Sequence, residues 1–301
     1  MPDYVIEGEG ITVRYGDFTA VDRIDIAVER GEIYGFLGPN GAGKTTTVRA
    51  LTTMSRPTEG VIRIGGCAIS EEPERARSMI GVVQQHIALD KDISVRENII
   101  CRALLHKIPK RDIGPRMEEL CGAIGLVPYM EKTVSELSGG WKRKAAIVCA
   151  LMHMPEILFL DEPTAGLDTQ SRHMLWDMIR IMNRRGTTVF ITTHYMDEAE
   201  ALCDRVSIIG SGRIMDTGTP RELCARLGKY AVEYDGGGGI REYRFFDSRE
   251  EARAFYDSVE GMNATIRGTH LEDVFLEETG RTNVRVCEEA LRLRCPFSMT
   301  P

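Results

Sequence analysis

A glycine-rich segment near the N-terminus carries the residue types that bind a polyphosphate. Its residues, in order, are Gly38, Pro39, Asn40, Gly41, Ala42, Gly43, Lys44, Thr45 and Thr46. They match the phosphate-binding loop pattern G-x-x-x-x-G-K-[ST]. An apolar stretch, 33–37, precedes the loop, and a stretch without Gly or Pro, 45–54, follows it. The sequence therefore predicts a buried strand, a turn that surrounds an anion with backbone N–H groups, and a helix N-terminus.

Individual loop residues have distinct predicted roles. Lys44 would reach the β- and γ-phosphates, and the Thr45 hydroxyl would ligate Mg²⁺. Gly38, Gly41 and Gly43 would let the backbone approach the anion without a Cβ in the way. The alternative is an ordinary glycine-rich turn, which the flanking strand and helix patterns disfavour.

Two consecutive carboxylates, Asp161 and Glu162, follow the apolar residues 157–160. At the C-terminal end of a buried strand this arrangement is typical of a Walker B motif. Asp161 would hold Mg²⁺ directly or through water, and Glu162 would act as general base on the attacking water. A solvated acidic turn is the alternative interpretation.

A second anion site is indicated by Ser138, Gly139 and Gly140, which follow Leu137. Ser138 would cap a helix that begins near Trp141, and the two glycines would expose the N-terminal amides of that helix. Taken alone, this segment favours a plain helix cap with a glycine hinge.

Together these motifs resemble the ATP-binding subunits of ABC transporters, whose signature is the segment 137–140. The resemblance covers about residues 4–226 and includes Gln85, the segment 165–168 and His194. The C-terminal segment 269–276 is similar to the drug-resistance branch of multidrug and antibiotic exporters. The implied fold is α/β: a P-loop ABC ATPase domain with a mixed-sheet core, an antiparallel β subdomain and a helical subdomain.

The resemblance also assigns roles to residues outside the loop. It implies that Tyr15 stacks on adenine, although an amphipathic strand aromatic is the alternative. Gln85 would contact Mg²⁺ and the attacking water, and would begin the segment that meets a membrane subunit. His194 would contact the γ-phosphate, and Asp168 would lie in a loop that contacts the opposite protomer.

The signature implies that the chain acts as a homodimer. In the family that it resembles, Ser138, Gly139 and Gly140 face the phosphate of the partner's ATP, so that two chains enclose two ATP molecules. Hydrolysis removes the contact that favours closure, and the pair reopens. This cycle would drive a separate membrane-spanning subunit in export, possible cargoes being drugs or antibiotics.

One signature position departs from the family pattern. Trp141 stands where the family most often has Gln, which puts the polar contact expected there in doubt. The alternatives are packing against the nucleotide or against the partner's loop. The basic residues 142–144 that follow either add positive potential near the phosphates or form a solvated helix face.

The order of patterns along the chain predicts its domains. Alternating residues 11–15 and 24–28 predict two antiparallel strands joined at 16–18. We expect an ABC ATP-binding domain over 1–228, with a helical subdomain at about 86–150 that is interrupted at Pro109, Gly114 and Pro115. A small α+β domain is predicted over 229–280, followed by a tail, 281–301, that is partly disordered.

Bulk composition limits the possible functions. Of 301 residues, 43% are hydrophobic and 28% are charged, as in globular proteins. The net charge of −7 argues against nucleic acid as a partner. The longest apolar run, 145–152, is too short to cross a bilayer, and the N-terminus shows no secretory signal. Eight cysteines without a C-x-x-C pair suit reduced thiols, so we expect a cytoplasmic protein. The family resemblance implies that it is peripheral on the cytoplasmic face of the membrane.

Two other functions are weighed against transport. A non-transport ABC ATPase acting on ribosomes or DNA would usually carry two cassettes or a long coiled coil, neither of which is present. A phosphate-loop kinase or GTPase would leave the signature unexplained, and no Asn-Lys-x-Asp motif for guanine occurs. The transported substrate and the direction of transport are not encoded in these motifs.

Overall fold

The computed structural model describes residues 3–235, 241–259 and 263–278. The chain divides into two compact units, Met1–Ile214 and Met215–Pro301, so the division falls before the boundary predicted after residue 228. The predicted tail, 281–301, lies outside the described residues.

A six-stranded sheet forms the centre of the first unit, in the order β10-β9-β3-β8-β7-β6. Its strands are β3 (Ile33–Leu37), β6 (Ile80–Val83), β7 (Ile157–Asp161), β8 (Thr188–Thr193), β9 (Arg205–Gly210) and β10 (Arg213–Gly218). Strands β9, β3, β8, β7 and β6 are parallel to one another. Strands β3, β7 and β8 are buried along their whole length, which explains their continuous apolar sequences.

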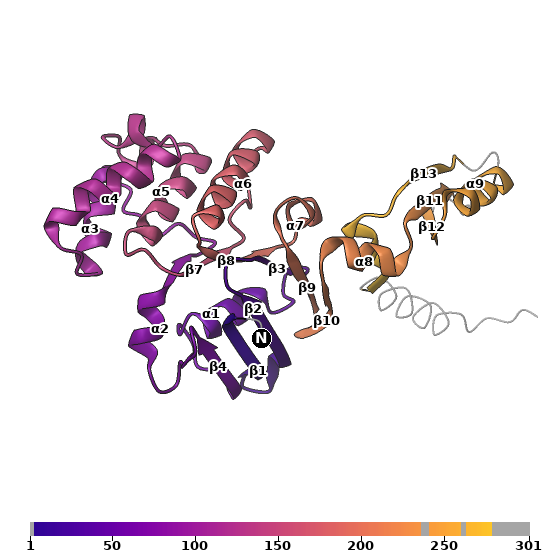
Figure 1. Ribbon diagram of the computed structural model, residues 1–301, viewed down its shortest axis with the longest axis horizontal. Coiled ribbons are helices and arrows are strands. Elements are labelled where there is room, and N and C mark those ends of the chain that lie inside the picture. The colour runs from indigo at the N-terminus through magenta and orange to yellow at the C-terminus, as the bar shows by residue number, and fades with distance from the viewer. Residues whose placement is uncertain (1–2, 236–240, 260–262, 279–301) are drawn as a thin grey trace, which may run out of the picture. The chain divides into compact units, whose positions relative to one another are not determined.

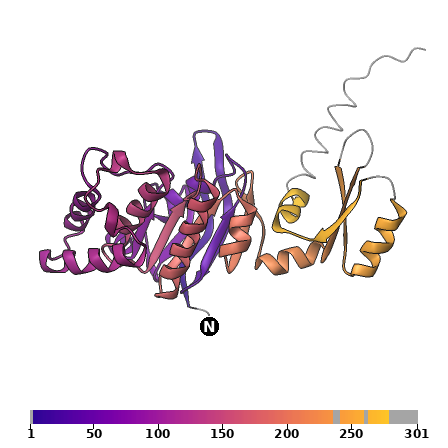
Figure 2. The same cartoon turned by 90° about the horizontal axis from the view of Figure 1, so that it is seen from above.

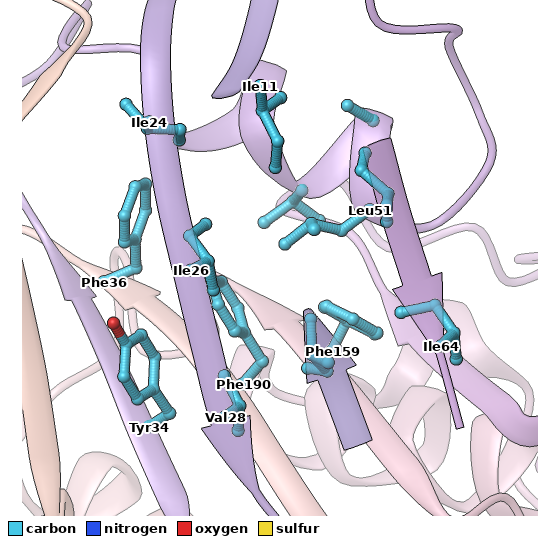
Figure 3. Packing of buried hydrophobic residues seen from close by; sticks show 14 of the residues in the cluster. Ile11, Ile24, Ile26, Val28, Tyr34, Phe36, Leu51, Ile64, Phe159 and Phe190 are labelled. Atoms are coloured by element: carbon cyan, nitrogen blue, oxygen red, sulfur yellow. The ribbon is translucent and has the colours of Figure 1, made fainter. Parts of the chain in front are cut away.

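Aromatic side chains hold the central strands in register. The ring centroid of Phe190 on β8 lies 5.7 Å from that of Phe36 on β3 and 5.4 Å from that of Phe159 on β7. Figure 3 shows these rings among the isoleucines of the same buried cluster. Because each ring is fully buried, this packing fixes where the three strands end relative to one another.

A second, antiparallel sheet has the order β2-β1-β4-β5. Its strands are β1 (Tyr4–Tyr15), β2 (Phe18–Glu29), β4 (Glu59–Ile64) and β5 (Cys67–Ala68). Val13 pairs with Val21 and Tyr15 with Phe18, which confirms the two antiparallel strands predicted here. The turn consists of residues 16–17, since Phe18 already belongs to β2.

Helices flank the parallel strands in the chain, and the last two of them connect β7 to β8 and β8 to β9. They are α1 (Lys44–Leu51), α2 (Pro73–Met79), α6 (Thr169–Arg184) and α7 (Met196–Leu202). The predicted strand–helix–strand unit is β7-α6-β8, and its two strands are parallel neighbours. Helix α1 begins one residue earlier and ends three residues earlier than the predicted range, 45–54.

A group of helices follows β6 and matches the predicted helical subdomain. It contains α3 (Val95–Leu105), α4 (Lys110–Ala123) and α5 (Gly139–Leu151), with the short 3₁₀ helices η1 (Val127–Tyr129) and η2 (Val134–Glu136). Helices α3, α4 and α5 gather together in Figure 1 and contact one another.

The predicted interruption at Gly114 and Pro115 is wrong, because α4 continues through both residues. The helix buries Ile113, Met117 and Cys121 on one face. Their four-residue spacing anchors that face in the subdomain. This burial offsets the hydrogen bond that a single proline removes from the helix.

The second unit has the predicted α+β composition. It contains α8 (Pro220–Leu227), β11 (Tyr230–Asp235), β12 (Arg241–Phe246), α9 (Arg249–Ser258), β13 (Thr265–Gly268) and helical residues 271–278. The strands form a sheet in the order β12-β11-β13. Phe255 of α9 packs on Tyr234 and Phe246 at 5.3 and 5.4 Å, and Figures 1 and 2 show α9 along this sheet.

Membrane-spanning helices were sought over the part of the chain that the structure describes. None of its helices combines the length and the apolar character that a crossing needs.

Candidate functional site

Four parallel strands bring the predicted site residues to one edge of the central sheet. Leu37 pairs with Thr193, Asp161 with Thr192, and Val83 with Leu160. The phosphate loop follows β3, Gln85 follows β6, Glu162 follows β7 and His194 follows β8. The carboxyl ends of parallel strands are where such sheets bind ligands.

The phosphate loop needs glycine at two positions for steric reasons. A Cβ on Gly38 would lie 2.4 Å from the Ile209 carbonyl oxygen. Gly43 has φ of 106°, and a Cβ there would lie 2.6 Å from the Ala20 carbonyl oxygen. The left-handed backbone of Gly43 directly precedes α1, so the turn ends with the helix N-terminus facing the loop.

Lys44 is buried and fixed inside the loop. Its Nζ donates hydrogen bonds to the carbonyl oxygens of Gly38 and Pro39 at 2.7 and 3.1 Å. The same nitrogen forms an ion pair with Glu162 Oε1 at 3.1 Å. The ammonium therefore links the phosphate loop to the carboxylate predicted to be the general base.

Asp161 is buried at the end of β7, beside two hydroxyl groups. Its Oδ1 accepts hydrogen bonds from Thr192 Oγ1 at 2.6 Å and Thr45 Oγ1 at 3.3 Å. Carboxylate, hydroxyl and amide oxygens are the ligands that Mg²⁺ prefers. The structure thus brings together Thr45 and Asp161, two of the three predicted metal ligands, and this donor set fits Mg²⁺.

Glu162 is surrounded by nitrogen atoms from three other segments. Beyond Lys44, its Oε2 accepts a hydrogen bond from Gln85 Nε2 at 3.2 Å. His194 Nδ1 lies 3.4 Å from the same oxygen, without the alignment of a hydrogen bond. The structure therefore brings all four predicted catalytic residues, Lys44, Gln85, Glu162 and His194, into one cluster.

The backbone of Glu162 is in the left-handed region, with φ of 46°. Such a conformation costs a residue with a Cβ about 1–2 kcal/mol, and it concentrates at functional sites. It is held by Thr192, whose carbonyl and hydroxyl oxygens accept from the Glu162 N–H at 3.1 and 3.0 Å. Thr192 was not predicted, since a threonine inside a strand looks like any β-branched residue.

Arg143 is a second residue that the sequence analysis did not identify. It is buried on α5 and donates from Nη1 and Nη2 to the carbonyl oxygens of Gln84 and Gln85 at 2.8 and 3.0 Å. Burial lowers the pKa of its guanidinium. Lys144 is buried as well. The prediction of a solvated helix face over 142–144 is therefore wrong for Arg143 and Lys144.

The signature segment is separate from the phosphate loop of its own chain. Ser138 occupies the N-cap position of α5 as predicted, but its side chain makes no capping hydrogen bond. Ser138 and Gly139 are exposed, whereas Gly140 is buried close to Ser171. Among the described residues, no hydrogen bond joins 137–141 to residues 38–46. The exposed amides at this helix N-terminus suit an anion that comes from outside.

Trp141 packs inside the helical subdomain. Its ring stacks on Tyr129 with centroids 4.1 Å apart, and Lys144 Nζ lies 4.4 Å from its centroid. The sequence analysis predicted that Trp141 packs on the nucleotide or on a loop of the partner. It did not predict these contacts with Tyr129 and Lys144. Aromatic stacking and a cation–π contact explain why a large ring is stable here.

Two predicted residues lie on the surface around the site. Tyr15 is 52% exposed at the end of β1, beside the turn that leads into β2. Asp168 is the N-cap of α6, where its carboxylate accepts from Ser171 N and Ser171 Oγ at 2.9 and 2.7 Å. These Ser171 bonds lower the pKa of Asp168. The capping role of Asp168 was not predicted.

A groove of about 520 Å³ adjoins the segment after Gln85. Its charged lining consists of Arg77 and Arg102, and among the described residues that form it there is no Asp or Glu. His106 and His153 stack in the groove with centroids 3.9 Å apart. Burial lowers the pKa of both imidazoles.

The sequence and the fold are similar to those of known proteins. Residues 21–165 match the ABC transporter family. The daunorubicin resistance ATP-binding protein DrrA3 of Streptomyces coeruleorubidus is 42% identical over 228 residues, which cover 76% of this chain and 72% of that protein. The Nod factor export ATP-binding protein I of Rhizobium meliloti is 36% identical over 300 residues, which cover 93% and 90%.

A solved structure shares the fold as well. The structure of cbiO1 from Clostridium perfringens, described as part of the ABC transporter complex cbiONQ, has a TM-score of 0.69 at 30% identity. The alignment covers 74% of this chain and 91% of cbiO1.

These similarities define the class of protein as a P-loop ATPase with the ABC signature. The chain belongs to the ABC transporter family. It is an ATP-binding, ATP-hydrolysing subunit of this family, as the family resemblance of its motifs predicted.

Proposed function

We propose that two copies of this chain enclose Mg²⁺-ATP and use its hydrolysis to drive a separate membrane-spanning subunit. The observation that carries this proposal is the Glu162 carboxylate at the end of β7. Lys44, Gln85 and His194 surround it from three other segments. Such a cluster beside a phosphate loop suits activation of water next to a γ-phosphate.

Each residue of the cluster has a chemical task in this proposal. Glu162 accepts a proton from the attacking water, and Gln85 orients that water. Lys44 offers positive charge and His194 offers a hydrogen-bond donor to the phosphates, while the amides of residues 38–46 surround them. Tyr15 is exposed and free to stack on adenine.

Thr45, Asp161 and Gln85 are proposed as the metal-binding residues. Their hydroxyl, carboxylate and amide oxygens form a hard donor set, which fits Mg²⁺. Bound there, Mg²⁺ would neutralise charge on the phosphate oxygens.

The second copy is proposed because the signature is exposed and not bonded to its own phosphate loop. Ser138 and the amides of Gly139 and Gly140 would bind the phosphates of the partner's ATP. Asp168, next to the signature through Ser171, would contact the same partner. A charge-assisted hydrogen bond contributes about 1.5–3 kcal/mol, so ATP favours the closed pair and hydrolysis reverses it.

The groove beside Gln84 is the proposed contact for the membrane-spanning subunit. Its apolar floor, with Arg77 and Arg102 at the side, fits a helical segment that carries carboxylates. A chain that works this way is peripheral to the cytoplasmic face of the membrane. The names of the relatives support export as the direction, with a drug or antibiotic as one class of cargo.

The variant Glu162→Gln tests the proposed roles of the base and of the second copy. It should lower kcat by about 10²–10⁴-fold, because the amide cannot accept the proton. ATP should still convert the chain from monomer to dimer in size-exclusion chromatography. Glu118→Gln, on the exposed side of α4, is the matched control and should change neither. A Glu162→Gln chain that stays monomeric with ATP would contradict the ATP-enclosing pair.

A further inference from the structure

Arg143 connects two functional segments that are far apart in the sequence. It lies on α5, the helix that the signature begins, five positions after Ser138. Both of its hydrogen bonds among the described residues go to consecutive carbonyl oxygens, those of Gln84 and Gln85. These two carbonyl groups flank the α-carbon of Gln85, whose side chain donates to Glu162 at 3.2 Å.

We infer that Arg143 is a positioning residue for ATP hydrolysis. By holding the 84–85 backbone, it keeps the Gln85 amide within reach of Glu162. The inference rests on the proposed role of Gln85 and adds to it the physical link that places this residue. Because Arg143 lies on α5, a displacement of this helix would also move Gln85. Closure of the signature on a partner would in this way change the position of Gln85 beside the proposed base, Glu162.

The choice of arginine supports this function over simple packing. A buried guanidinium is costly to desolvate. Among the described residues, Arg143 forms no ion pair with a carboxylate that would offset this cost. Its Nε is buried without a hydrogen-bond partner in the described structure. An apolar residue would fill the space without these costs. The planar guanidinium, however, donates hydrogen bonds to two consecutive carbonyl oxygens at the same time, which an apolar residue cannot do.

The test compares three variants of the full purified chain by steady-state ATPase kinetics. Arg143→Met should lower kcat by about 10- to 100-fold, because two charged hydrogen bonds are lost. The KM for ATP should change by less than about twofold, since Lys44 and the phosphate loop are untouched. Arg143→Lys, which keeps one donor and the charge, should fall between Met and wild type.

Arg116→Met is the matched control. Arg116 also donates to a backbone carbonyl in the helical subdomain, from Nη1 to Met152 O at 3.2 Å, but it does not touch residues 84–85. It should leave kcat unchanged. Thermal unfolding of each variant separates misfolding from mispositioning, and Arg143→Lys carries the test if Arg143→Met does not fold.

A double-mutant cycle with Gln85→Ala identifies the route of the effect. If Arg143 acts through Gln85, Arg143→Met should lower kcat by less than about threefold in the Gln85→Ala background. Multiplicative losses would overturn the inference, and so would an Arg143→Met or Arg143→Lys protein with wild-type kcat. Glu162→Gln in the same assay keeps the two proposals apart: if it retains full kcat, the proposed base is wrong whatever Arg143 does.

Discussion

Thr192 binds both members of the carboxylate pair through one hydroxyl group. Its Oγ1 donates to Asp161 Oδ1 at 2.6 Å and accepts from the Glu162 N–H at 3.0 Å. This hydroxyl therefore orients the proposed metal ligand and holds the left-handed backbone of the proposed base. Among the described residues, no hydrogen bond joins its side chain to the phosphate loop or the signature, so we attribute its effect on catalysis to the geometry of the carboxylate pair.

Thr192→Val should lower the ATPase kcat by about tenfold and stability by about 1–3 kcal/mol. Valine keeps the shape but removes the hydroxyl, which leaves Asp161 with one hydrogen bond fewer. Steady-state kinetics and urea unfolding measure the two effects.

Thr188→Val is the control on the same strand. Thr188 Oγ1 accepts from the Gly31 N–H at 2.9 Å, at the opposite end of β8 from the site. This variant should lose similar stability and keep its kcat. Equal kcat losses in both variants would show that β8 destabilisation, rather than carboxylate geometry, limits turnover.

The parts of the site that sequence could predict are those where chemistry and strand ends coincide. The loop 38–46 and Asp161–Glu162 each follow an apolar run, and parallel strands place their carboxyl ends at one edge. The roles of Gln85 and His194 were predicted from the family resemblance, because a lone Gln or His after a strand does not identify a site. Their convergence around Glu162 follows from the order β3-β8-β7-β6.

Thr192 and Arg143 could not be predicted because their partners are distant in sequence. Thr192 lies 31 positions from Asp161, and Arg143 lies 58 positions from Gln85. A charged residue in a basic run looks exposed until tertiary packing buries it, as happens on α5. The break expected at Pro115 failed for a similar reason, because packing of the α4 face overrides local propensity.

Gly43→Ala should disrupt the phosphate loop more severely than the left-handed backbone conformation of residue 43 alone would predict. The new Cβ would lie 2.6 Å from the Ala20 carbonyl oxygen, and φ of 106° adds about 1–2 kcal/mol. We expect a loss of more than about 2 kcal/mol in unfolding free energy and at least tenfold weaker ATP binding. Urea unfolding and fluorescent-nucleotide titration measure these quantities.

Gly125→Ala separates backbone strain from the clash. Gly125 has φ of 70° and open space around its Cβ position, so its substitution should cost only about 1–2 kcal/mol and leave ATP binding unchanged. If Gly43→Ala were no worse than Gly125→Ala, the close approach to Ala20 would not be a constraint on the loop.

Trp141→Gln, which restores the usual signature residue, should weaken the helical subdomain. It removes the stack on Tyr129 and the contact with Lys144, worth about 0.5–1.5 and 0.5–1 kcal/mol. Unfolding free energy should fall by about 1–2 kcal/mol, and a double-mutant cycle with Tyr129→Ala should show the coupling. ATP-dependent dimerisation should persist; its loss with unchanged stability would mean that Trp141 serves the nucleotide or the partner instead.

Glu198 should make stability depend on pH. It is fully buried on α7, where it accepts from Trp176 Nε1 at 3.0 Å and Thr164 Oγ1 at 3.1 Å. Burial raises its pKa despite these hydrogen bonds. The folded state therefore holds a proton that the unfolded state has released, and the slope of unfolding free energy against pH is negative between the two pKa values. The contribution is fully present below the unfolded pKa of about 4.3 and is lost as pH rises through the folded value.

Glu198→Gln should remove this dependence, because the amide keeps a hydrogen-bonding group there that does not ionise. Urea unfolding from pH 5 to pH 8 should show the variant gaining stability relative to wild type as pH rises. Trp176→Phe, which removes one donor and keeps the carboxyl group, should steepen the wild-type slope, since the ionised form loses a partner. Parallel pH profiles for wild type and Glu198→Gln would mean that Glu198 stays ionised in the folded protein throughout this range.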